Sequence, residues 1–284
     1  MKLGTLRDGT RDGRLMVIGG DVTQGSDASH LAPSLLRALE DWDLVGTELE
    51  LIGRGIDGGS QPVERFHERG AHSPLPHAPR LLIAEEAAEP RLRPVEAEAF
   101  LDPREPLPEA TGIAISLAVA SGPVRAGAGA AEAAEAIRLV LLMLRLTGGV
   151  ADPKDEPVCF APAAVSPETL EGAPLDRRVT INGTLYAPAG LPATAVFERG
   201  VFAEMIARAA GCGAVEAGSL FAAPPFLTRR IATGDMLRIE LRDADGHTAF
   251  GAIEQAVSVA RPREPATGIA AGGAAAAMLW APWL

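Results

Sequence analysis

The chain has 284 residues with 26 basic and 37 acidic side chains, so its formal net charge is −11. An acidic chain repels phosphate backbones, which disfavours nucleic-acid binding, and the length predicts one or two domains. Two cysteines, Cys159 and Cys212, are too few for a disulfide framework or a structural zinc site, and both are expected to be buried. The first 20 residues lack the apolar run of a signal peptide, which favours a cytoplasmic location.

The N-terminal third begins with a predicted β-hairpin at residues 1–20, where Asp-Gly pairs separate two short apolar runs. Residues 27–52 predict a helix that follows a serine cap and carries leucines on one side. Residues 53–111 have few periodic apolar runs and many prolines, so we expect an extended loop with short strands. The charged run at 84–100 is expected to be a solvated face.

Residues 112–122, "GIAISLAVASG", predict a strand with two unlike faces, because large and small residues alternate with a period of two. The large face is ordinary core. The small face has no charge and no bulky group, and its members are Ala114, Ser116, Ala118 and Ala120. We expect a buried strand whose small face borders a cavity or a collapsed pocket.

The segment at 123–149 predicts a helix in its alanine-rich half, and residues 137–144 predict a buried strand or the end of that helix. Within it, "GAGAAE" at 127–132 imitates a dinucleotide-binding fingerprint. Glu132 stands where a third small residue should allow close helix packing, so an alanine- and glycine-rich loop is the better interpretation.

The C-terminal half predicts loops and short strands at 150–196, with a hairpin turn at Asn182-Gly183. An amphipathic helix is predicted to end at Gly211, and a final hairpin is predicted around the Asp245-Gly246 turn. The apolar stretch at 267–284 favours a tail that packs or docks a partner over a membrane anchor.

Two isolated candidates for chemistry are weak. His67, His72 and His77 recur every five residues, a spacing that does not converge on one helix face, and nearby prolines exclude a regular helix. Solvated loop histidines are therefore favoured over a zinc site formed by loop folding. Ser219 lacks the flanking glycines of a nucleophile elbow.

Both ends of the chain carry longer motifs. Residues 1–42 resemble the N-terminal module of bacterial fumarylacetoacetate hydrolase family proteins. Residues 226–257 resemble the end of their catalytic domain, where a G-D-x-V-x-I-E segment leads into D-G-x-x-x-F-G-x-I-x-Q. The intermediate stretches "SPLPHA", "FLDPREPLP", "IRLVLLM" and "VSPETL" also fit, so the resemblance covers nearly the whole chain.

The resemblance implies a mainly β fold with some α (α+β), in which a small N-terminal α/β domain precedes a mixed β-sandwich roll. It implies a small N-terminal domain at residues 1–70, a roll domain with shortened active-site loops at 71–262, and an apolar tail at 263–284. The family cleaves carbon–carbon bonds in β-diketo acids or acylpyruvates, and relatives hydrate or decarboxylate related keto acids. Carboxylates there hold Mg²⁺ or Mn²⁺, which acts as a Lewis acid on the substrate oxygens.

The family's metal ligands do not carry over. Its first two lie in G-I-D-F-E-x-E-V-A, and the matching residues here are Ser116 and Ala118. Its aspartate ligand matches Arg145, whose charge would repel a cation. The family lysine matches Glu156 or Asp155, with Lys154 one or two places away. The threonine of G-S-G-T matches Ser219.

These substitutions predict a vestigial pocket with no metal and no cofactor, formed by Ser116, Ala118, Arg145, Glu156 and Ser219. We expect Arg145 to enter the former site and to meet Glu156 or Asp155 as its counter-charge. The resemblance then predicts a catalytically degenerate member that works as a binding or assembly subunit.

The alternative is a hydrolase, decarboxylase or hydratase that acts on a small β-diketo acid or acylpyruvate, with Mg²⁺ or without metal. In that case Arg145 would bind a substrate carboxylate, with Ser219 nearby. The expected partners are a second copy or an active family relative, with a small keto acid as ligand and neither nucleic acid nor membrane. Trp280 and Trp283 in the tail are candidate anchors for such a contact.

Overall fold

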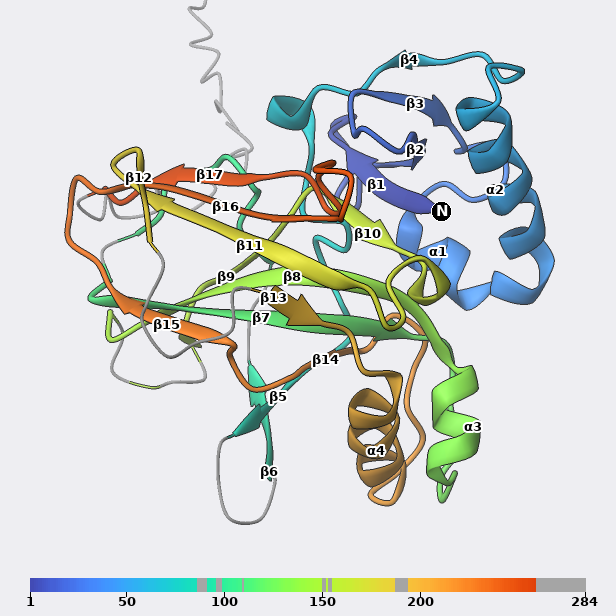
Figure 1. Ribbon diagram of the computed structural model, residues 1–284. Coiled ribbons are helices and arrows are strands. Elements are labelled where there is room, and N and C mark those ends of the chain that lie inside the picture. The colour runs from blue at the N-terminus through green and yellow to red at the C-terminus, as the bar shows by residue number, and fades with distance from the viewer. Residues whose placement is uncertain are drawn as a thin grey trace, which may run out of the picture.

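The computed structural model describes residues 1–85, 91–95, 99–108, 110–149, 152, 155–186 and 194–258. Over this part of the chain the protein is mainly β with few helices, as predicted (Figure 1). Two sheets face each other, and the N-terminal elements lie beside them.

The larger sheet has twelve strands in the described residues. Along the main path these are, in spatial order, β4 (Glu64–Arg65), β3 (Gln24–Asp27), β2 (Arg14–Ile18), β1 (Lys2–Leu6), β10 (Ala163–Val165), β8 (Ile137–Thr147), β7 (Gly112–Ser121), β14 (Leu220–Ala222), β5 (Leu81–Glu85) and β6 (Arg91–Val95). Beside this path, β15 (Leu227–Arg230) pairs with β7, and β9 (Val158–Phe160) pairs with β8. The long strands β7 and β8 therefore lie at the centre.

The smaller sheet covers one face of the larger one (Figure 1). Its strands are β12 (Thr184–Leu185), β11 (Pro174–Ile181), β16 (Met236–Arg242) and β17 (Ile253–Ala256), and β13 (Thr194–Val196) pairs with β11. Buried residues of both sheets share one hydrophobic cluster, which includes Leu142 of β8, Val179 of β11 and Leu241 of β16. This shared core makes the two layers a β-sandwich.

The predicted N-terminal hairpin is confirmed, since β1 and β2 pair antiparallel from Lys2 opposite Ile18. The predicted helix is divided into α1 (Leu35–Glu40) and α2 (Trp42–Asp57), with the break at Asp41. The predicted start at residue 27 is too early, because α1 begins at Leu35 with Ser34 as its N-cap, and the Ser34 side chain accepts a hydrogen bond from the backbone N–H of Arg37.

The N-terminal strands are continuous with the larger sheet, because β1 also pairs with β10 at Lys2 opposite Val165. Between β4 and β5 lies a short 3-10 helix, η1 (Glu68–Gly70), and a second one, η3 (Pro167–Thr169), follows β10. The domain boundary at residue 70 stays a prediction.

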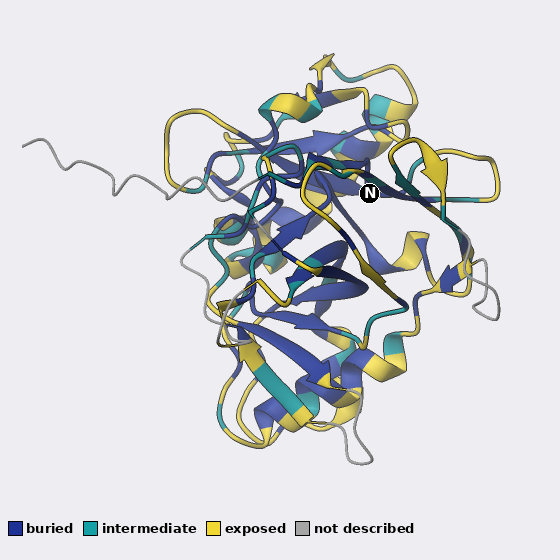
Figure 2. Cartoon of the chain, turned by 90° about the vertical axis from the view of Figure 1, so that its left-hand side faces the viewer, coloured by how far each residue is buried: buried dark blue, intermediate teal, exposed yellow. Residues whose placement is uncertain are grey.

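Strand β7 is buried along its whole length, as predicted. Figure 2 shows that buried residues are concentrated in strands in the interior of the molecule. Its large residues belong to the core between the sheets. Its small residues Ala118 and Ala120 belong to a second core, with Leu141 of β8, Phe160 of β9 and Leu39 of α1. The small face is thus packed under other elements and not open to solvent.

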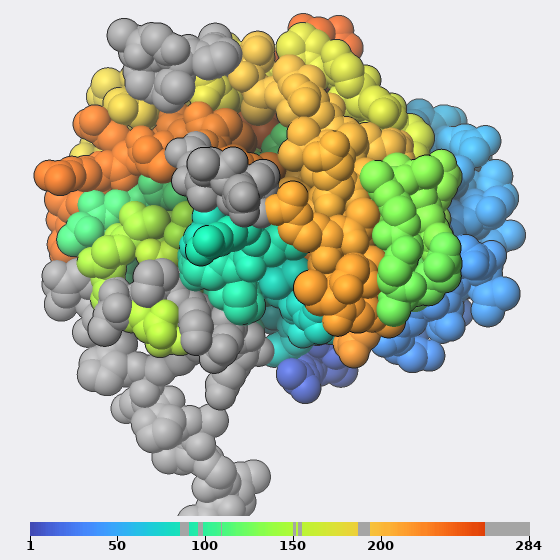
Figure 3. Space-filling view, turned by 90° about the horizontal axis from the view of Figure 1, so that it is seen from below, coloured from blue at the N-terminus to red at the C-terminus, as the bar shows by residue number. Residues whose placement is uncertain are grey.

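The remaining helices and turns follow local sequence signals. α3 (Ala130–Glu135) is the alanine-rich helix, α4 (Arg199–Ala210) ends at Gly211 as predicted, and the two lie side by side (Figure 3). Asn182 and Gly183 both have positive φ, as a tight hairpin turn between β11 and β12 requires. The predicted hairpin of β16 and β17 is confirmed.

One burial prediction is wrong. Cys159 is buried on β9, but Cys212 is exposed, because it lies in the turn just after the end of α4. The tail at 263–284, with Trp280 and Trp283, lies outside the described residues. In the described part, no helix is long and apolar enough to cross a membrane.

Candidate functional site

The small face of β7 meets a charged side chain at one end. Arg145 of β8 lies directly opposite Ala114 in the antiparallel register. Opposite residues of such a pair point to the same side of the sheet, so Arg145 shares the face of Ser116 and Ala118. Its side chain is only 15% exposed. The sequence prediction that placed Arg145 on this face therefore agrees with the register.

Arg145 forms a salt bridge with Glu156, in which Nη1 donates to Oε2. The Glu156 side chain is 9% exposed. It is held there because β9 pairs with β8, which puts Val158 opposite Arg145 and brings the preceding residues alongside. Of the two predicted counter-charges, Glu156 is the partner, while Asp155 is exposed. Both members of a largely buried ion pair are needed, because removal of one partner leaves the other as an uncompensated buried charge.

A second arginine extends the pair toward solvent. Arg93 of β6 places Nη2 3.6 Å from the same Glu156 oxygen, and its Nε lies 3.2 Å from Glu85 of β5. The Glu85 side chain is 45% exposed, so one end of this group reaches water. We name Arg145, Glu156, Arg93 and Glu85 the arginine–glutamate cluster.

The sequence interpretation missed two members of this cluster. Arg93 and Glu85 fall in the run at 84–100 that was expected to be a solvated face, yet the Arg93 side chain is only 18% exposed. The missing information is long-range. The hairpin of β5 and β6 lies at the edge of the sheet beyond β14, and no local pattern indicates that its arginine reaches Glu156.

The arginine–glutamate cluster does not fit a divalent cation. Mg²⁺ and Mn²⁺ need several oxygen ligands, but Ala114, Ser116 and Ala118 offer no carboxylate. The Glu156 carboxylate is already bound by Arg145. A fixed guanidinium at this position repels a second cation by Coulomb's law, and burial strengthens the repulsion.

Ser219 lies at the opposite end of β7. The backbone N–H of Ser121 donates to the carbonyl of Ser219, and the Ser219 hydroxyl donates to the carbonyl of Glu216 at 2.7 Å. Ser121 lies seven positions along the strand from Ala114, which corresponds to about 23 Å. The structure therefore does not bring Ser219 to Arg145. Lys154 lies outside the described residues.

The predicted histidine positions do not converge. His72 Nδ1 lies 2.9 Å from Asp102, and His77 Nδ1 lies 3.1 Å from Asp12. His67 is exposed before η1. Each described histidine of this series has its own surroundings, which favours the loop interpretation over a shared zinc site.

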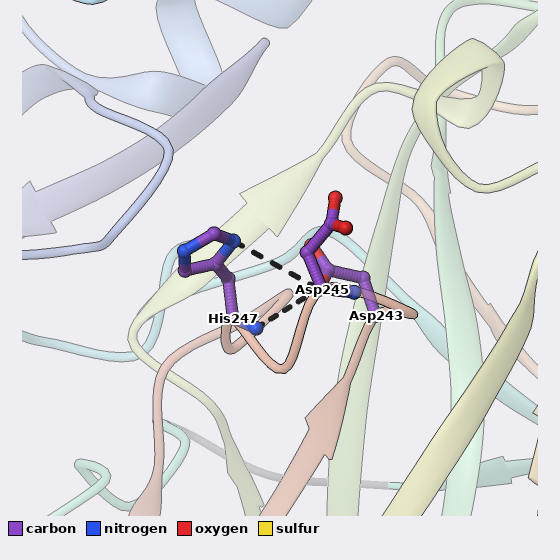
Figure 4. A group of neighbouring side chains, drawn as sticks. All are labelled: Asp243, Asp245 and His247. Atoms are coloured by element: carbon purple, nitrogen blue, oxygen red, sulfur yellow. Dashed lines mark hydrogen bonds and ion pairs between the residues drawn. The ribbon is translucent and has the colours of Figure 1, made fainter.

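A different group has the chemistry of metal ligands. The side chains of Asp243, Asp245 and His247 offer ligand atoms that all lie within 4.8 Å of one another, in the connection between β16 and β17 (Figure 4). Asp243 also accepts backbone hydrogen bonds from Asp245 at 3.0 Å and from His247 at 2.9 Å. Two carboxylates and an imidazole form a donor set that suits a divalent ion such as Mn²⁺. The sequence interpretation recognised this segment only as a turn.

Comparison with known proteins agrees with the architecture. Residues 1–77 match the family described as Fumarylacetoacetase N-terminal domain 2. No curated protein matches the sequence.

Solved structures with this fold cover most of the chain. Maleylpyruvate hydrolase from Sphingobium sp. SYK-6, in complex with manganese(II) ion and pyruvate, has 16% identity and a TM-score of 0.68, with 92% of this chain and 100% of that chain covered. Fumarylacetoacetate hydrolase from the psychrophilic Exiguobacterium antarcticum has 14% identity and a TM-score of 0.62, with 92% and 100% covered. 2-Hydroxyhepta-2,4-diene-1,7-dioate isomerase from Mycobacterium marinum has 15% identity and a TM-score of 0.59, with 91% and 98% covered.

The two-sheet roll with its N-terminal module defines a protein of the fumarylacetoacetate hydrolase-like α+β class. The match at residues 1–77 supports the predicted resemblance to the fumarylacetoacetate hydrolase family, and the solved structures show that the chain has this fold.

The prediction of no metal cofactor is wrong. A solved structure with the same fold carries manganese(II), and the chain itself holds the group of Asp243, Asp245 and His247. The error arose because the sequence interpretation considered only the positions that match the family's ligands and the histidines at 67, 72 and 77. It did not test the acidic turn between β16 and β17.

Proposed function

We propose that this chain uses the fumarylacetoacetate hydrolase fold as a cytoplasmic binding or assembly subunit, and that its β7–β8 region performs no carbon–carbon bond cleavage. The observation that carries the proposal is the salt bridge of Arg145 and Glu156 beside the small face of β7. Arg145 stands where the sequence resemblance assigns an aspartate metal ligand, and Glu156 stands where it assigns a lysine.

The physical reason is electrostatic. Cleavage of an acylpyruvate-type substrate needs a Lewis acid that stabilises the enolate as the carbon–carbon bond breaks. The β7–β8 region offers a guanidinium bound to its own carboxylate and no free oxygen ligand on Ala114 or Ala118. The side chains there stabilise each other and leave no position for a metal-bound enolate.

The first test is an acylpyruvate cleavage assay on the purified chain with added Mg²⁺ or Mn²⁺. We expect no turnover that depends on the arginine–glutamate cluster. Metal-dependent turnover that is abolished by Arg145→Met and retained by the surface variant Arg125→Met would contradict the proposal. Arg125 is the matched control because it forms an exposed salt bridge with Glu132.

A second candidate function is a metal-dependent hydrolase or isomerase that acts on a small β-diketo acid or acylpyruvate. The group of Asp243, Asp245 and His247 supports it, together with the shared fold of a maleylpyruvate hydrolase that contains manganese(II) and pyruvate. These three residues would hold the metal, which when bound would supply a Lewis acid.

Paired variants separate the two candidates. Asp243→Asn with His247→Ala should abolish Mn²⁺ binding in a titration, whereas Asp8→Asn should not, although Asp8 also accepts hydrogen bonds within a turn. If turnover is present and disappears together with Mn²⁺ binding in the first variant, the hydrolase or isomerase candidate is supported. Mn²⁺ binding that survives the first variant would reject this group as the metal site.

The assembly part of the proposal concerns a homodimer or a complex with an active relative. Sedimentation of the full chain should show a species larger than one chain at micromolar concentration. Substitution of Trp280 and Trp283 by alanine should weaken that species, because large aromatic side chains dominate many interfaces. A monomer at all concentrations, with and without a relative, would contradict it.

A further inference from the structure

A groove of about 700 Å³ shares no lining residue with either candidate site. The N-terminal module contributes Arg7 and Arg69, and the segment before β7 contributes Asp102 and residues 104–106. Its other wall is the start of β16 and the strand β17. A groove formed by three segments far apart in sequence is a frequent place for a small ligand.

Most charges in the groove have partners within the protein. Arg7 donates to Asp102 through Nε at 3.1 Å and also through Nη2, and His72 contacts the other oxygen of the same carboxylate. Arg104 binds Glu68 and Glu254. Glu254 also pairs with Arg238, so the charges of these groups balance and give the groove little net charge.

Two charges remain. Arg69 is exposed and has no hydrogen bond or ion pair from its side chain in the described part of the chain. Glu105 accepts one backbone N–H, from Asp102 at 3.2 Å, and has no basic partner among the described residues. A cation and an anion thus line the same groove without pairing with each other.

The other lining residues are three apolar residues and Gln255, whose side-chain oxygen accepts no hydrogen bond in the described residues. Pro106, Met236 and Ala256 line the groove, and Met236 is 50% exposed. Gln255 is almost fully buried, and its Nε2 donates to the carbonyl of Asp102 at 2.6 Å. This orientation leaves its Oε1 without a donor in the described residues. The groove therefore combines one free cation, one free anion and an apolar ledge.

We propose that this groove binds a small zwitterion with an apolar body, of the amino-acid or short-peptide class. The ligand carboxylate binds Arg69, the ligand ammonium binds Glu105, and the apolar body lies along Pro106 and Met236. Opposite charges on one surface favour a ligand with the complementary pair and disfavour ligands that carry only one of them.

The test is a calorimetric titration of the full chain with L-leucine and with leucyl-leucine. Two capped probes accompany them: N-acetyl-leucyl-leucine lacks the ammonium, and leucyl-leucine amide lacks the carboxylate. Binding of leucine assigns the site to amino acids, and binding of the dipeptide alone assigns it to short peptides. Each capped probe should bind about fivefold or more weakly than the dipeptide.

Charge-neutral variants identify the contacts. Arg69→Gln should weaken the dipeptide about fivefold and leave the amide probe unchanged, while Glu105→Gln should weaken the dipeptide and leave the acetylated probe unchanged. Arg65→Gln and Glu204→Gln are the matched controls, because both residues are exposed outside the groove and their substitution changes the net charge equally. Equal affinity for capped and uncapped probes, variants without effect, or no binding at about 10 mM would overturn the proposal.

Discussion

At the scale of single residues, the defining feature is a buried ion pair on a strand face that is otherwise made of small side chains. Arg145 and Glu156 are each within a few residues of a solvent-facing loop, yet both side chains are largely covered. Such a pair contributes little net stability, but removal of one partner is costly. Substitution of Arg145 or Glu156 alone is therefore expected to lower the stability of the fold.

Glu156→Gln should therefore lower the free energy of unfolding by about 3–5 kcal/mol, because it leaves Arg145 buried without a counter-charge. Urea denaturation measures the change. Glu132→Gln is the control, since its exposed pair with Arg125 is expected to contribute less than about 1 kcal/mol. A Glu156→Gln variant as stable as that control would show that the pair is not required for the fold.

Asp102 predicts the response to acid. Burial raises the pKa of this carboxyl, but hydrogen bonds from His72 and Arg7 outweigh burial and hold the pKa below its usual value of 3.8. A lowered folded-state pKa stabilises the protein above pH 3.8, and this contribution is lost as the pH falls below that value through the folded-state pKa. Asp102→Asn should therefore reduce the loss of unfolding free energy between about pH 4 and about pH 2, the range around the usual carboxyl pKa. Urea denaturation at each pH measures this free energy. An unchanged slope would reject this role.

At the scale of elements, β7 shows what a packed small face tolerates. Ala118 is fully buried, lies opposite Leu141 of β8 and Ala222 of β14, and belongs to the core under α1. Any larger side chain at this position must displace neighbours that already fill the space.

Ala118→Leu should destabilise the fold by about 1–3 kcal/mol through overpacking. Thermal or urea unfolding checks this, and Ala130→Leu is a matched control because Ala130 is exposed at the first turn of α3. If Ala118→Leu proves neutral, the small face borders free space and not a filled core.

The elements also show where sequence reasoning succeeds. The Asn182-Gly183 turn and the end of α4 at Gly211 depend on neighbours within a few residues, and both were predicted. The break at Asp41 was missed, because the apolar pattern continues through it. Cys212 was misplaced because its apolar neighbours in sequence do not surround it in the fold.

The site was predicted only in part, and for a physical reason. The resemblance predicted that Arg145 meets Glu156, because it aligned both residues with active-site positions of the family, and the salt bridge is present. Arg93 joins them only because a distant hairpin lies beside β14. Asp243 and His247 lie close together because of the geometry of the turn between them. The residue types alone do not indicate in which direction these side chains point.

At the scale of the whole molecule, the chain shares its fold with solved enzymes. The roll and its N-terminal module match solved enzymes over more than nine-tenths of the chain at 14–16% identity. A fold does not determine the reaction, because function depends on the groups placed in the site. In this chain the central strand pair carries a salt bridge, while possible metal ligands lie in the connection between β16 and β17.

The position of bound manganese is therefore the most direct test. A crystal of the full chain soaked with Mn²⁺ and measured by anomalous diffraction would locate the ion. We predict density at Asp243, Asp245 and His247 and none beside Ser116, Ala118 and Arg145. Manganese bound on the small face of β7, with Arg145 displaced from Glu156, would contradict the claim that this strand pair has lost its metal chemistry.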